Sequence, residues 1–347
     1  MEIRTIVLGG GPVGCMAALA AARTGPVLLI EPRINQAAAA PRIDAVPAPL
    51  LALLIEFGIH PAEMGVSHLH DTALSAWEDA DPVWSRTPAK AHIERAALER
   101  ALHARVGRTR AILVSARRDD ADLFSGARLI DATGRQAVTA SKRVQPGSPK
   151  FARIFTLDGS LSPAEQAFRI AALPGGYVYR LGTAALLTVG IVGGRDAVAA
   201  SAHSLESWIR DCGAEWILQG LSPLAAMRSG RGGVASVQFS EGDTVDGGRT
   251  VRVGDAAFAR DSLSSQGIAN GISDALHVLA DPEAALIRRD AQRGTHLTSL
   301  LTTIHRNRFH ADPGWTGYTA FLSRCVDGAL ATPEVLARAE VLARAEL

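Results

Sequence analysis

Residues 3–33, IRTIVLGGGPVGCMAALAAARTGPVLLIEPR, constrain the fold of this chain more than any other segment. Residues 5–8 form a short, continuous apolar run, which is typical of a strand buried on both faces of a parallel sheet. Three glycines follow, and then residues 15–23, which are rich in Ala, Leu and Met and predict a helix. A second apolar run at 27–30 predicts another buried strand. The order of strand, glycine turn, helix and strand predicts a nucleotide-binding unit built around a parallel sheet.

The glycines have the spacing G-x-G-x-x-G, in which each glycine has a separate physical role. Gly9 allows the tight turn, Gly11 lets a pyrophosphate approach the backbone, and Gly14 lets the helix pack close to the strand. The phosphates would lie at the helix N-terminus, where free N–H groups and the helix dipole favour anions. Glu31, 20 residues after Gly11, would bind the ribose of an adenine nucleotide. A glycine-rich turn without a ligand is the alternative, and the spacing favours the dinucleotide site.

The composition indicates a globular protein with about two domains. The chain has 347 residues, 47% of them hydrophobic, and a formal net charge of +1. This charge gives no reason to expect binding to nucleic acid or to a membrane surface. The sequence contains no run of 18 apolar residues that is free of charge, so no membrane span is predicted. The three cysteines, Cys15, Cys212 and Cys325, form neither a metal motif nor a disulfide framework. We therefore expect a cytoplasmic protein without a leader peptide or a metal site.

The pattern of elements predicts an α/β protein in which a Rossmann-like domain is interrupted by an inserted domain. Helices are expected at 45–59, 91–106, 203–219 and 268–280, whereas residues 60–90 look loop-rich. From about residue 150 the chain changes to longer alternating strands, which favours an antiparallel sheet. The predicted nucleotide-binding domain comprises 1–60, 91–140 and 246–282, the antiparallel-sheet substrate domain comprises 61–90 and 141–245, and a helical C-terminal segment comprises 283–347.

A second motif lies at residues 251–275, VRVGDAAFARDSLSSQGIANGISDA. A buried strand ends at Asp255, where α/β proteins bind ligands, and a carboxylate there can bind the hydroxyls of a sugar-alcohol chain. A loop of small residues then leads through Gln266 and Gly267 into another helix, whose N–H groups could face an anion or a polarised ring edge.

These two motifs, together with an ATG turn after a strand at 129–135, resemble the FAD-dependent class A flavoprotein monooxygenases. The tryptophan-halogenase-like branch is the most similar, and it includes monooxygenases that mature tryptophan-derived quinone cofactors. The resemblance spans most of the chain and is strongest at 3–42, 92–102, 129–135 and 251–275.

The resemblance implies that the first domain binds FAD and assigns roles to individual residues. Gly9, Gly11 and Gly14 would surround the pyrophosphate, and Glu31 the adenosine ribose. Arg42 and Arg95 match positions that reach the flavin phosphates or nearby backbone, Asp255 would bind the ribityl chain, and Gln266 and Gly267 would approach the isoalloxazine. The full set of predicted cofactor-binding residues is Gly9, Gly11, Pro12, Val13, Gly14, Glu31, Arg33, Arg42, Arg95, Gly134, Asp255, Gln266, Gly267 and Ile268. Arg95 could instead lie on a solvated helix face, and the nearby Asp131 could simply cap a turn.

The chain also departs from the family pattern. It has Asp261-Ser262-Leu263 where the family usually has Asp-Pro-Leu, and Ser265 where a glycine often precedes Gln-Gly. The halogenase signature W-x-W-x-I-P is absent, and Lys90 is the only lysine in the region where a halogenase would need one. Halogenation is therefore disfavoured.

The resemblance implies hydroxylation of an electron-rich aromatic ring, either on a tryptophan side chain of a partner protein or on a free small molecule. A non-oxygenating FAD oxidoreductase is the alternative from another class. No second G-x-G-x-x-G follows, so NAD(P)H would bind transiently or a separate flavin reductase would supply reduced flavin. No catalytic residue is assigned, although His68, His70, His305 and His310 are candidate bases.

The C-terminal segment at 305–324 is rich in arginine and aromatic residues and has two interpretations. Its side chains could rim an open groove that accepts a polypeptide, since Arg, Trp and Tyr dominate protein interfaces. Alternatively, they could pack the C-terminal helices onto the rest of the protein. The residues concerned are Arg306, Arg308, Phe309, Trp315, Tyr318, Phe321 and Arg324.

Overall fold

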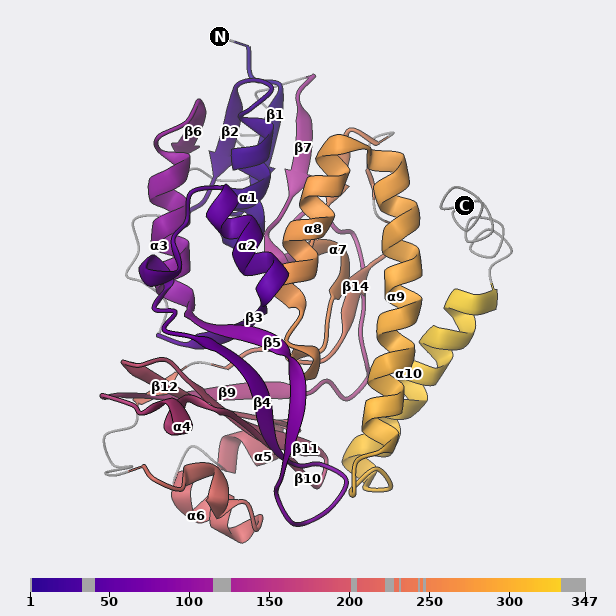
Figure 1. Ribbon diagram of the computed structural model, residues 1–347. Coiled ribbons are helices and arrows are strands. Elements are labelled where there is room, and N and C mark those ends of the chain that lie inside the picture. Colours follow the sequence, from indigo (N-terminus) through magenta and orange to yellow (C-terminus); the bar gives the residue numbers. More distant parts are fainter. Residues whose placement is uncertain are drawn as a thin grey trace.

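The computed structural model contains two large sheets with helices packed around them (Figure 1). The structure describes residues 2–32, 41–114, 126–200, 205–221, 228–230, 232–242, 244–245 and 248–331. Among the helices in these ranges, none combines the length and the apolar character needed to cross a bilayer.

The first sheet carries the predicted nucleotide-binding unit. Its six strands lie in the order β15-β16-β7-β1-β2-β6, and all neighbours are parallel except β15 and β16. The strands are β1 (Thr5–Leu8), β2 (Val27–Ile30), β6 (Ala111–Val114), β7 (Arg128–Asp131), β15 (Thr244–Val245) and β16 (Thr250–Arg252). The short apolar runs form these strands because a parallel sheet buries both of its faces.

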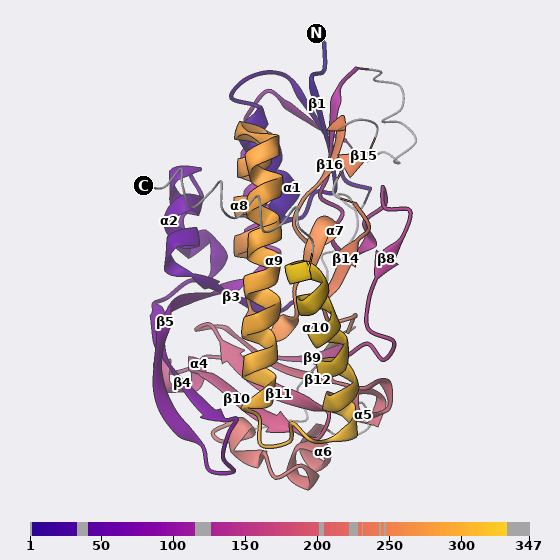
Figure 2. The ribbon, with the colours of Figure 1, turned by 90° about the vertical axis from the view of Figure 1, so that its right-hand side faces the viewer.

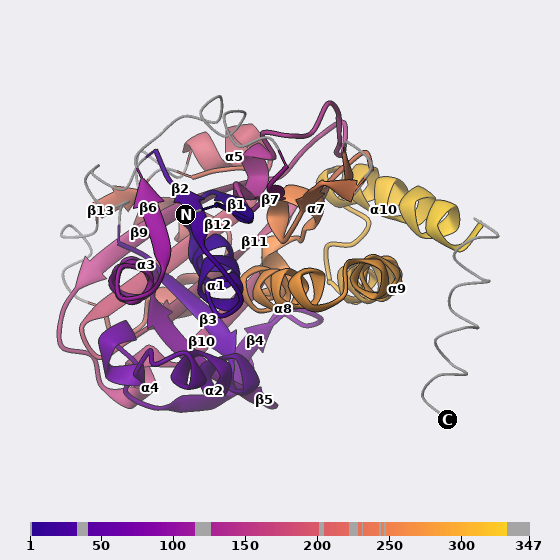
Figure 3. The same cartoon turned by 90° about the horizontal axis from the view of Figure 1, so that it is seen from above.

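Three helices cover one face of this sheet. They are α1 (Pro12–Ala21), α3 (Arg95–Val106) and α8 (Gly267–Ala280). Helix α1 lies between the other two (Figure 3). Val7, Leu29 and Ile130 of the sheet pack with the helices in one apolar core, into which α2 (Ala48–Glu56) also packs.

The second sheet has eight strands in the order β13-β9-β12-β11-β10-β4-β5-β3. All neighbouring strands are antiparallel except β4 and β10. The strands are β3 (Ile43–Pro47), β4 (Leu69–Ala76), β5 (Val83–Glu94), β9 (Phe151–Asp158), β10 (Phe168–Leu173), β11 (Gly176–Gly182), β12 (Leu186–Gly193) and β13 (Arg228–Gly230). One face packs against α5 (Arg195–Ala200), α6 (Leu205–Asp211) and a 3-10 turn at Glu215–Leu218.

The remaining elements connect and cover the two sheets. A short helix α4 (Pro163–Gln166) precedes β10, and α7 (Asp255–Phe258) follows β16 after two intervening residues. Strands β8 (Arg143–Val144) and β14 (Gln238–Ser240) pair with each other. Helices α9 (Pro282–His305) and α10 (Pro313–Ala331) lie side by side (Figures 1 and 2).

The C-terminal aromatic residues pack into the core and do not rim a groove. Trp315 is 1% exposed, Tyr318 2% and Phe321 8%, and they pack with Tyr177 and Phe258. The interface interpretation is therefore wrong for these three side chains. They stabilise the contact between α10 and the rest of the fold because burial removes large apolar surfaces from water.

Several local predictions need correction. Residues 60–90 are not mainly loop, since β4 and β5 form a long hairpin there. Helix α3 begins at Arg95 and not at residue 91, because β5 continues to Glu94. The helix predicted at 203–219 is divided between α6 and the 3-10 turn, and Gly213 between them has a φ of +64°. The predicted domain boundaries stay a prediction; β3, assigned there to the nucleotide-binding domain, pairs within the eight-stranded sheet.

Candidate functional site

A cleft of about 1740 Å³ lies between the two sheets. Its polar side is formed by the segments that follow β1, β2, β7 and β16, so it lies at the carboxyl ends of the parallel strands. Ligands bind at this edge in open α/β sheets because the loops and helix N-termini converge there. Strands β9, β10 and β11 of the second sheet form the opposite, largely apolar wall.

The glycine turn between β1 and α1 leaves one position open toward the cleft. A Cβ at Gly9 would lie 2.6 Å from the Ala132 carbonyl O, and the φ of Gly9 is +93°. A Cβ at Gly14 would lie 1.8 Å from the Gly9 carbonyl O, so α1 could not pack this closely with any other residue there. A Cβ at Gly11, in contrast, has no atom within 4 Å. Gly11, Pro12 and Val13 line the cleft, which gives a ligand direct access to the first turn of α1.

Glu31 lies at the end of β2 and lines the same cleft. Its side chain is buried, and its Oε2 accepts a hydrogen bond of 2.7 Å from the Gly10 N–H. His103 Nε2 donates to the Gly10 carbonyl O at 2.7 Å. Side chains therefore form hydrogen bonds with both the N–H and the carbonyl group of Gly10, the middle glycine of the turn. Arg33, which was predicted with this group, lies outside the described residues.

Arg42 and Arg95 come together around Asp44. The Asp44 Oδ2 lies 3.8 Å from Arg42 Nε and 3.5 Å from Arg95 Nη1, and Arg95 Nε also pairs with Glu99 at 3.1 Å. The Arg95 N–H donates to the Arg42 carbonyl O at 2.9 Å, which joins the start of α3 to the segment before β3. The Asp44 carboxylate raises the pKa of Arg42. Both arginines line the cleft, so Arg95 does not lie on a solvated helix face.

Asp255 lies directly beside the first turn of α8. Gly254, with a φ of +57°, turns the chain from β16 into α7 and thereby places the Asp255 carboxylate in the cleft. A Cβ on Gly267 would lie 3.6 Å from Asp255 Oδ1, and Arg135 Nε lies 3.8 Å from Asp255 Oδ2. Gln266, Gly267 and Ile268 also line the cleft, so the two motifs of the sequence meet at one site.

The turn after β7 contains two residues for which a role was predicted, Gly134 and Asp131, and only Gly134 lines the cleft. Gly134 has a φ of +64° and lines the cleft with no atom within 4 Å of a Cβ position. Asp131, however, is fully buried and accepts hydrogen bonds from the backbone and hydroxyl groups of Thr133 and Thr139. Asp131 therefore caps this turn and does not line the cleft.

The apolar wall contains residues that the sequence did not single out. Tyr177 and Tyr179 alternate along β11, and the Tyr177 hydroxyl lies 2.6 Å from Ser262 Oγ. Burial, with a smaller effect from the Asp44 charge, raises the pKa of Tyr179 to about 12. Its phenol is therefore neutral at physiological pH. The period-two pattern in GYVYRLG was the available signal, because alternate residues of a strand face the same side. The wall residues are Ala152, Ile154, Phe168, Ile170, Tyr177, Tyr179 and Leu181.

None of the four candidate histidines lies among the described residues that line the cleft. His70 stacks on His92, with 4.0 Å between ring centroids, and His68 lies 4.1 Å from His70. His92 Nδ1 donates to the Gly182 carbonyl O at 2.8 Å. The histidine that lines the cleft is His103, whose contact with the glycine turn indicates a structural role. Within the described ranges, no group of His, Cys, Asp and Glu could hold a metal ion.

The chain matches no protein-family model and no curated protein, but its fold matches solved structures. One is QhpG, a peptidyl tryptophan dihydroxylase essential for tryptophylquinone cofactor biogenesis, at 20% identity and a TM-score of 0.69 over 91% of this chain and 78% of that chain. Another is the myxobacterial chondrochloren halogenase CndH, a variant of FAD-dependent halogenases, at 18% identity and a TM-score of 0.69 over 96% of this chain and 92% of that chain. A third is aklavinone-11 hydroxylase in complex with FAD and aklavinone, at 16% identity and a TM-score of 0.65 over 90% of this chain and 71% of that chain. The predicted resemblance is therefore confirmed for the fold: this chain has the mixed α/β fold that FAD-dependent hydroxylases and halogenases share.

Proposed function

We propose that this protein is an FAD-dependent monooxygenase that hydroxylates an electron-rich aromatic ring. The observation that carries the proposal is the convergence of the glycine turn, Glu31, Asp255 and the start of α8 on one cleft. The fold shared with FAD-dependent enzymes supports it. The cleft also exceeds the roughly 300–1,000 Å³ of ordinary small-ligand sites. It therefore has space for a dinucleotide and a second ligand.

The residues of the polar side fit FAD. The open position at Gly11 and the first turn of α1 would receive the pyrophosphate, since a side chain there would occupy that space. Glu31 would accept hydrogen bonds from the adenosine ribose, and Asp255 from the ribityl hydroxyls. Arg42 and Arg95 would supply positive charge near the phosphates.

When bound, FAD would supply the redox chemistry that transfers one oxygen atom of O2 to the substrate. The protein would position both reactants and exclude water. The apolar side chains of β9, β10 and β11 are suited to this exclusion because they offer few groups that hold water.

Hydroxylation is favoured over halogenation by the residues of the cleft. The W-x-W-x-I-P signature is absent. Lys90 lies on β5, paired with His70 and Pro47, and does not line the cleft. The described residues that line the cleft include no lysine. Reaction mixtures with reduced FAD, O2, chloride and tryptophan are expected to yield no chlorotryptophan.

The substrate ring is proposed to be a tryptophan side chain of a partner polypeptide that matures into a quinone cofactor. The size of the cleft and the likeness to a peptidyl tryptophan dihydroxylase support this choice. A free aromatic molecule is the second candidate, supported by the likeness to aklavinone-11 hydroxylase. The C-terminal aromatics no longer contribute, since they are buried. A separate flavin reductase, or NAD(P)H that binds transiently, would provide the electrons.

The test is oxygen transfer by the FAD-loaded protein. Reduced FAD and O2 are supplied with a tryptophan-containing peptide or with free tryptophan, and mass spectrometry measures a gain of about 16 or 32 mass units per product, as expected for oxygen insertion. Failure of the purified protein to take up FAD would overturn the proposal. Uptake of FAD with oxidation of reduced flavin, but without oxygen transfer to any aromatic compound, would favour the non-oxygenating oxidoreductase.

A further inference from the structure

The apolar wall of the cleft has a gap at one strand. Strand β12 lies between β9 and β11 in the sheet, and both of those neighbours line the cleft. No residue of β12, which the structure describes in full, does so. The other β12 residues on this face are covered. Leu186 packs with Ile43 and Leu181, Thr188 Oγ1 accepts a hydrogen bond of 3.0 Å from the Ile43 N–H, and Val192 packs in the core that contains Trp315.

Gly190 is the remaining position on that face, and Tyr179 covers it. The register aligns Ile154, Gly190, Tyr179 and Ile170 across four neighbouring strands. A Cβ on Gly190 would lie 2.1 Å from Tyr179 Cζ and 2.4 Å from its hydroxyl O. Real Cβ atoms do not approach another atom so closely. The Tyr179 ring therefore lies across β12 in the space that any other residue at position 190 would occupy.

This arrangement makes the Tyr179 ring a flat part of the cleft wall, which we call the aromatic floor. The Tyr179 ring is flanked in register by the Ile154 and Ile170 side chains, and all three line the cleft. The Tyr177 ring, which is 2% exposed, lies beside it, with 6.2 Å between the two ring centroids and 37° between the ring planes. Aromatic rings pack against one another in offset or tilted arrangements, so such a floor suits a planar aromatic ligand.

We propose that the Tyr179 ring is the floor of the site for the substrate's aromatic ring, and that Gly190 is a positioning residue that keeps this floor flat. The inference rests on the proposed function, which it deepens by naming the residues that determine the depth of the ring site. A side chain at position 190 would force the Tyr179 ring away from the sheet and into the cleft, where it would occupy the space of the substrate.

The test uses Gly190→Ala and a matched control on the same strand. Gly193→Ala adds the same methyl group, but its Cβ would lie at an ordinary 3.6 Å from Ala197 Cβ. The ligand probe is indole, titrated into the FAD-loaded protein and followed by the flavin absorbance spectrum. Gly190→Ala is expected to weaken indole binding at least 10-fold and to leave FAD affinity unchanged, whereas Gly193→Ala changes neither.

A second readout follows the tyrosine itself. The chain has only three tyrosines, so nitration by tetranitromethane followed by peptide mass spectrometry reports on Tyr179 individually. Gly190→Ala is expected to increase nitration of Tyr179 several-fold without any flavin present. In a Tyr179→Ala background, adding Gly190→Ala is expected to have no further effect on indole binding, and this double variant also removes the clash if Gly190→Ala alone fails to fold.

Several results would overturn the inference. They are equal indole affinity in the parent and Gly190→Ala, no indole binding by the parent, unchanged nitration of Tyr179, or a further loss of indole binding from Gly190→Ala when Tyr179 is already alanine. FAD uptake by the parent tests the proposed function separately. A parent that binds FAD but gives one of these results refutes the inference alone.

Discussion

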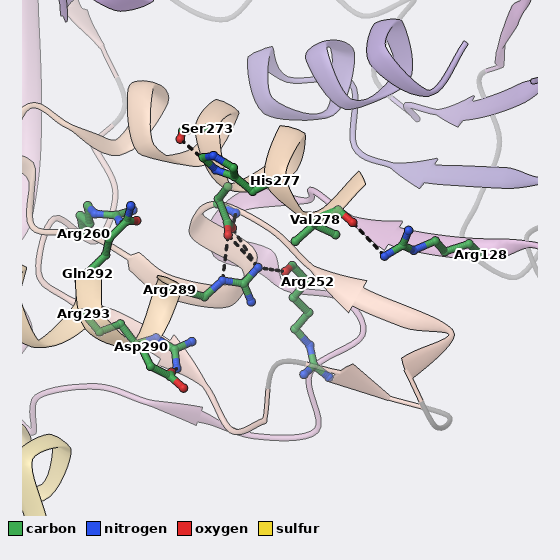
Figure 4. A network of polar contacts seen from close by, with 12 residues as sticks. Arg128, Arg252, Arg260, Ser273, His277, Val278, Arg289, Asp290, Gln292 and Arg293 are labelled. Atoms are coloured by element: carbon green, nitrogen blue, oxygen red, sulfur yellow. Dashed lines mark hydrogen bonds and ion pairs between the residues drawn. The ribbon is translucent and has the colours of Figure 1, made fainter. Parts of the chain in front are cut away.

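Asp274 on α8 and Arg289 on α9 form a buried ion pair that also holds the turn before Asp255. Figure 4 shows Arg289 and its contact with Arg252. The two side chains are 10% and 3% exposed, and their closest N···O distance is 2.9 Å. Asp274 Oδ2 accepts a hydrogen bond of 2.9 Å from the Gly254 N–H, and Arg289 Nη2 donates to the Arg252 carbonyl O at 2.8 Å. The pair therefore links two helices to both ends of the segment 252–254.

Removal of the arginine from this pair should destabilise the protein strongly. Arg289→Met leaves the Asp274 carboxylate buried without its cation, which is expected to reduce the free energy of unfolding by about 3–5 kcal/mol. Urea denaturation measures the change. The control is Arg210→Met, which breaks an exposed pair with Glu206 and is expected to cost less than about 1 kcal/mol. Equal losses in the two variants would contradict a structural role for the buried pair.

Two substitutions in the glycine turn should have different effects, one on FAD binding and the other on stability. Gly11→Val places a side chain in open space, so the free energy of unfolding should change by no more than about 1 kcal/mol. The affinity for FAD should fall by about 100-fold or more, because the side chain occupies the space of the pyrophosphate. Gly14→Ala instead collides with the Gly9 carbonyl and should cost about 3 kcal/mol or more in stability. Fluorescence titration with FAD and thermal unfolding distinguish the two effects. A Gly11→Val protein that binds FAD as tightly as the parent would refute the pyrophosphate assignment.

Asp255→Ala should weaken FAD binding more than it destabilises the fold. The loss of charge-assisted hydrogen bonds to the ribityl chain is expected to cost about 1.5–3 kcal/mol, or about 10- to 150-fold in affinity. Asp158→Ala is the control, because this exposed residue pairs with Arg228 and lies outside the cleft lining. Isothermal titration with FAD provides the comparison, and an unchanged affinity in Asp255→Ala would reject the ribityl role.

Ser265 has a left-handed backbone at a position where the family that the sequence resembles often has glycine. Its φ is +51°, a conformation that costs a non-glycine residue roughly 1–2 kcal/mol. Ser265→Gly should therefore stabilise the protein by up to about 1 kcal/mol after the entropic cost of glycine, and Ser265→Val should destabilise it. The neighbouring Ser264→Gly, where Oγ donates to the Asp261 carbonyl O at 2.8 Å, should be destabilising. A destabilised Ser265→Gly protein in urea denaturation would show that strain at this position is absent.

Three buried histidines should make the protein sensitive to acid. Burial lowers the pKa of His70 and His296 to about 4, and of His92 to about 3. The unfolded chain binds these protons near pH 6.5, whereas the folded protein does not, so stability is greatest above pH 6.5 and falls as the pH decreases toward 4. Each histidine contributes up to about 1.4 kcal/mol per pH unit in this window.

Urea denaturation at pH 7.5, 6.0 and 5.0 measures this dependence. His92→Asn retains a donor toward the Gly182 carbonyl but cannot bind a proton, so it should reduce the slope by the contribution of one histidine. The control is His305→Asn, the same substitution at an exposed histidine. A slope that is the same in the parent and His92→Asn would contradict the assignment.

The sequence alone was sufficient to predict the elements whose signals are local. The apolar runs of β1 and β2, the spacing of Gly9, Gly11 and Gly14, and the acid after β2 are encoded within 31 consecutive residues. The segment around Asp255 is equally compact. Short-range spacing reveals such units because glycine conformation, strand burial and helix initiation depend mainly on neighbouring residues.

Only the tertiary structure decided which distant segments meet and which side chains face the cleft. The β4–β5 hairpin looked like loop because residues 60–90 contain several Pro and Asp residues, and α3 begins only at Arg95 because β5 continues to Glu94. The burial of Trp315 and Tyr318 and the fit of Tyr179 over Gly190 depend on pairings between remote strands and helices. Composition and residue spacing do not specify such contacts, because the same aromatic residues can rim an interface or fill a core. Packing against the rest of the chain determines which of the two they do.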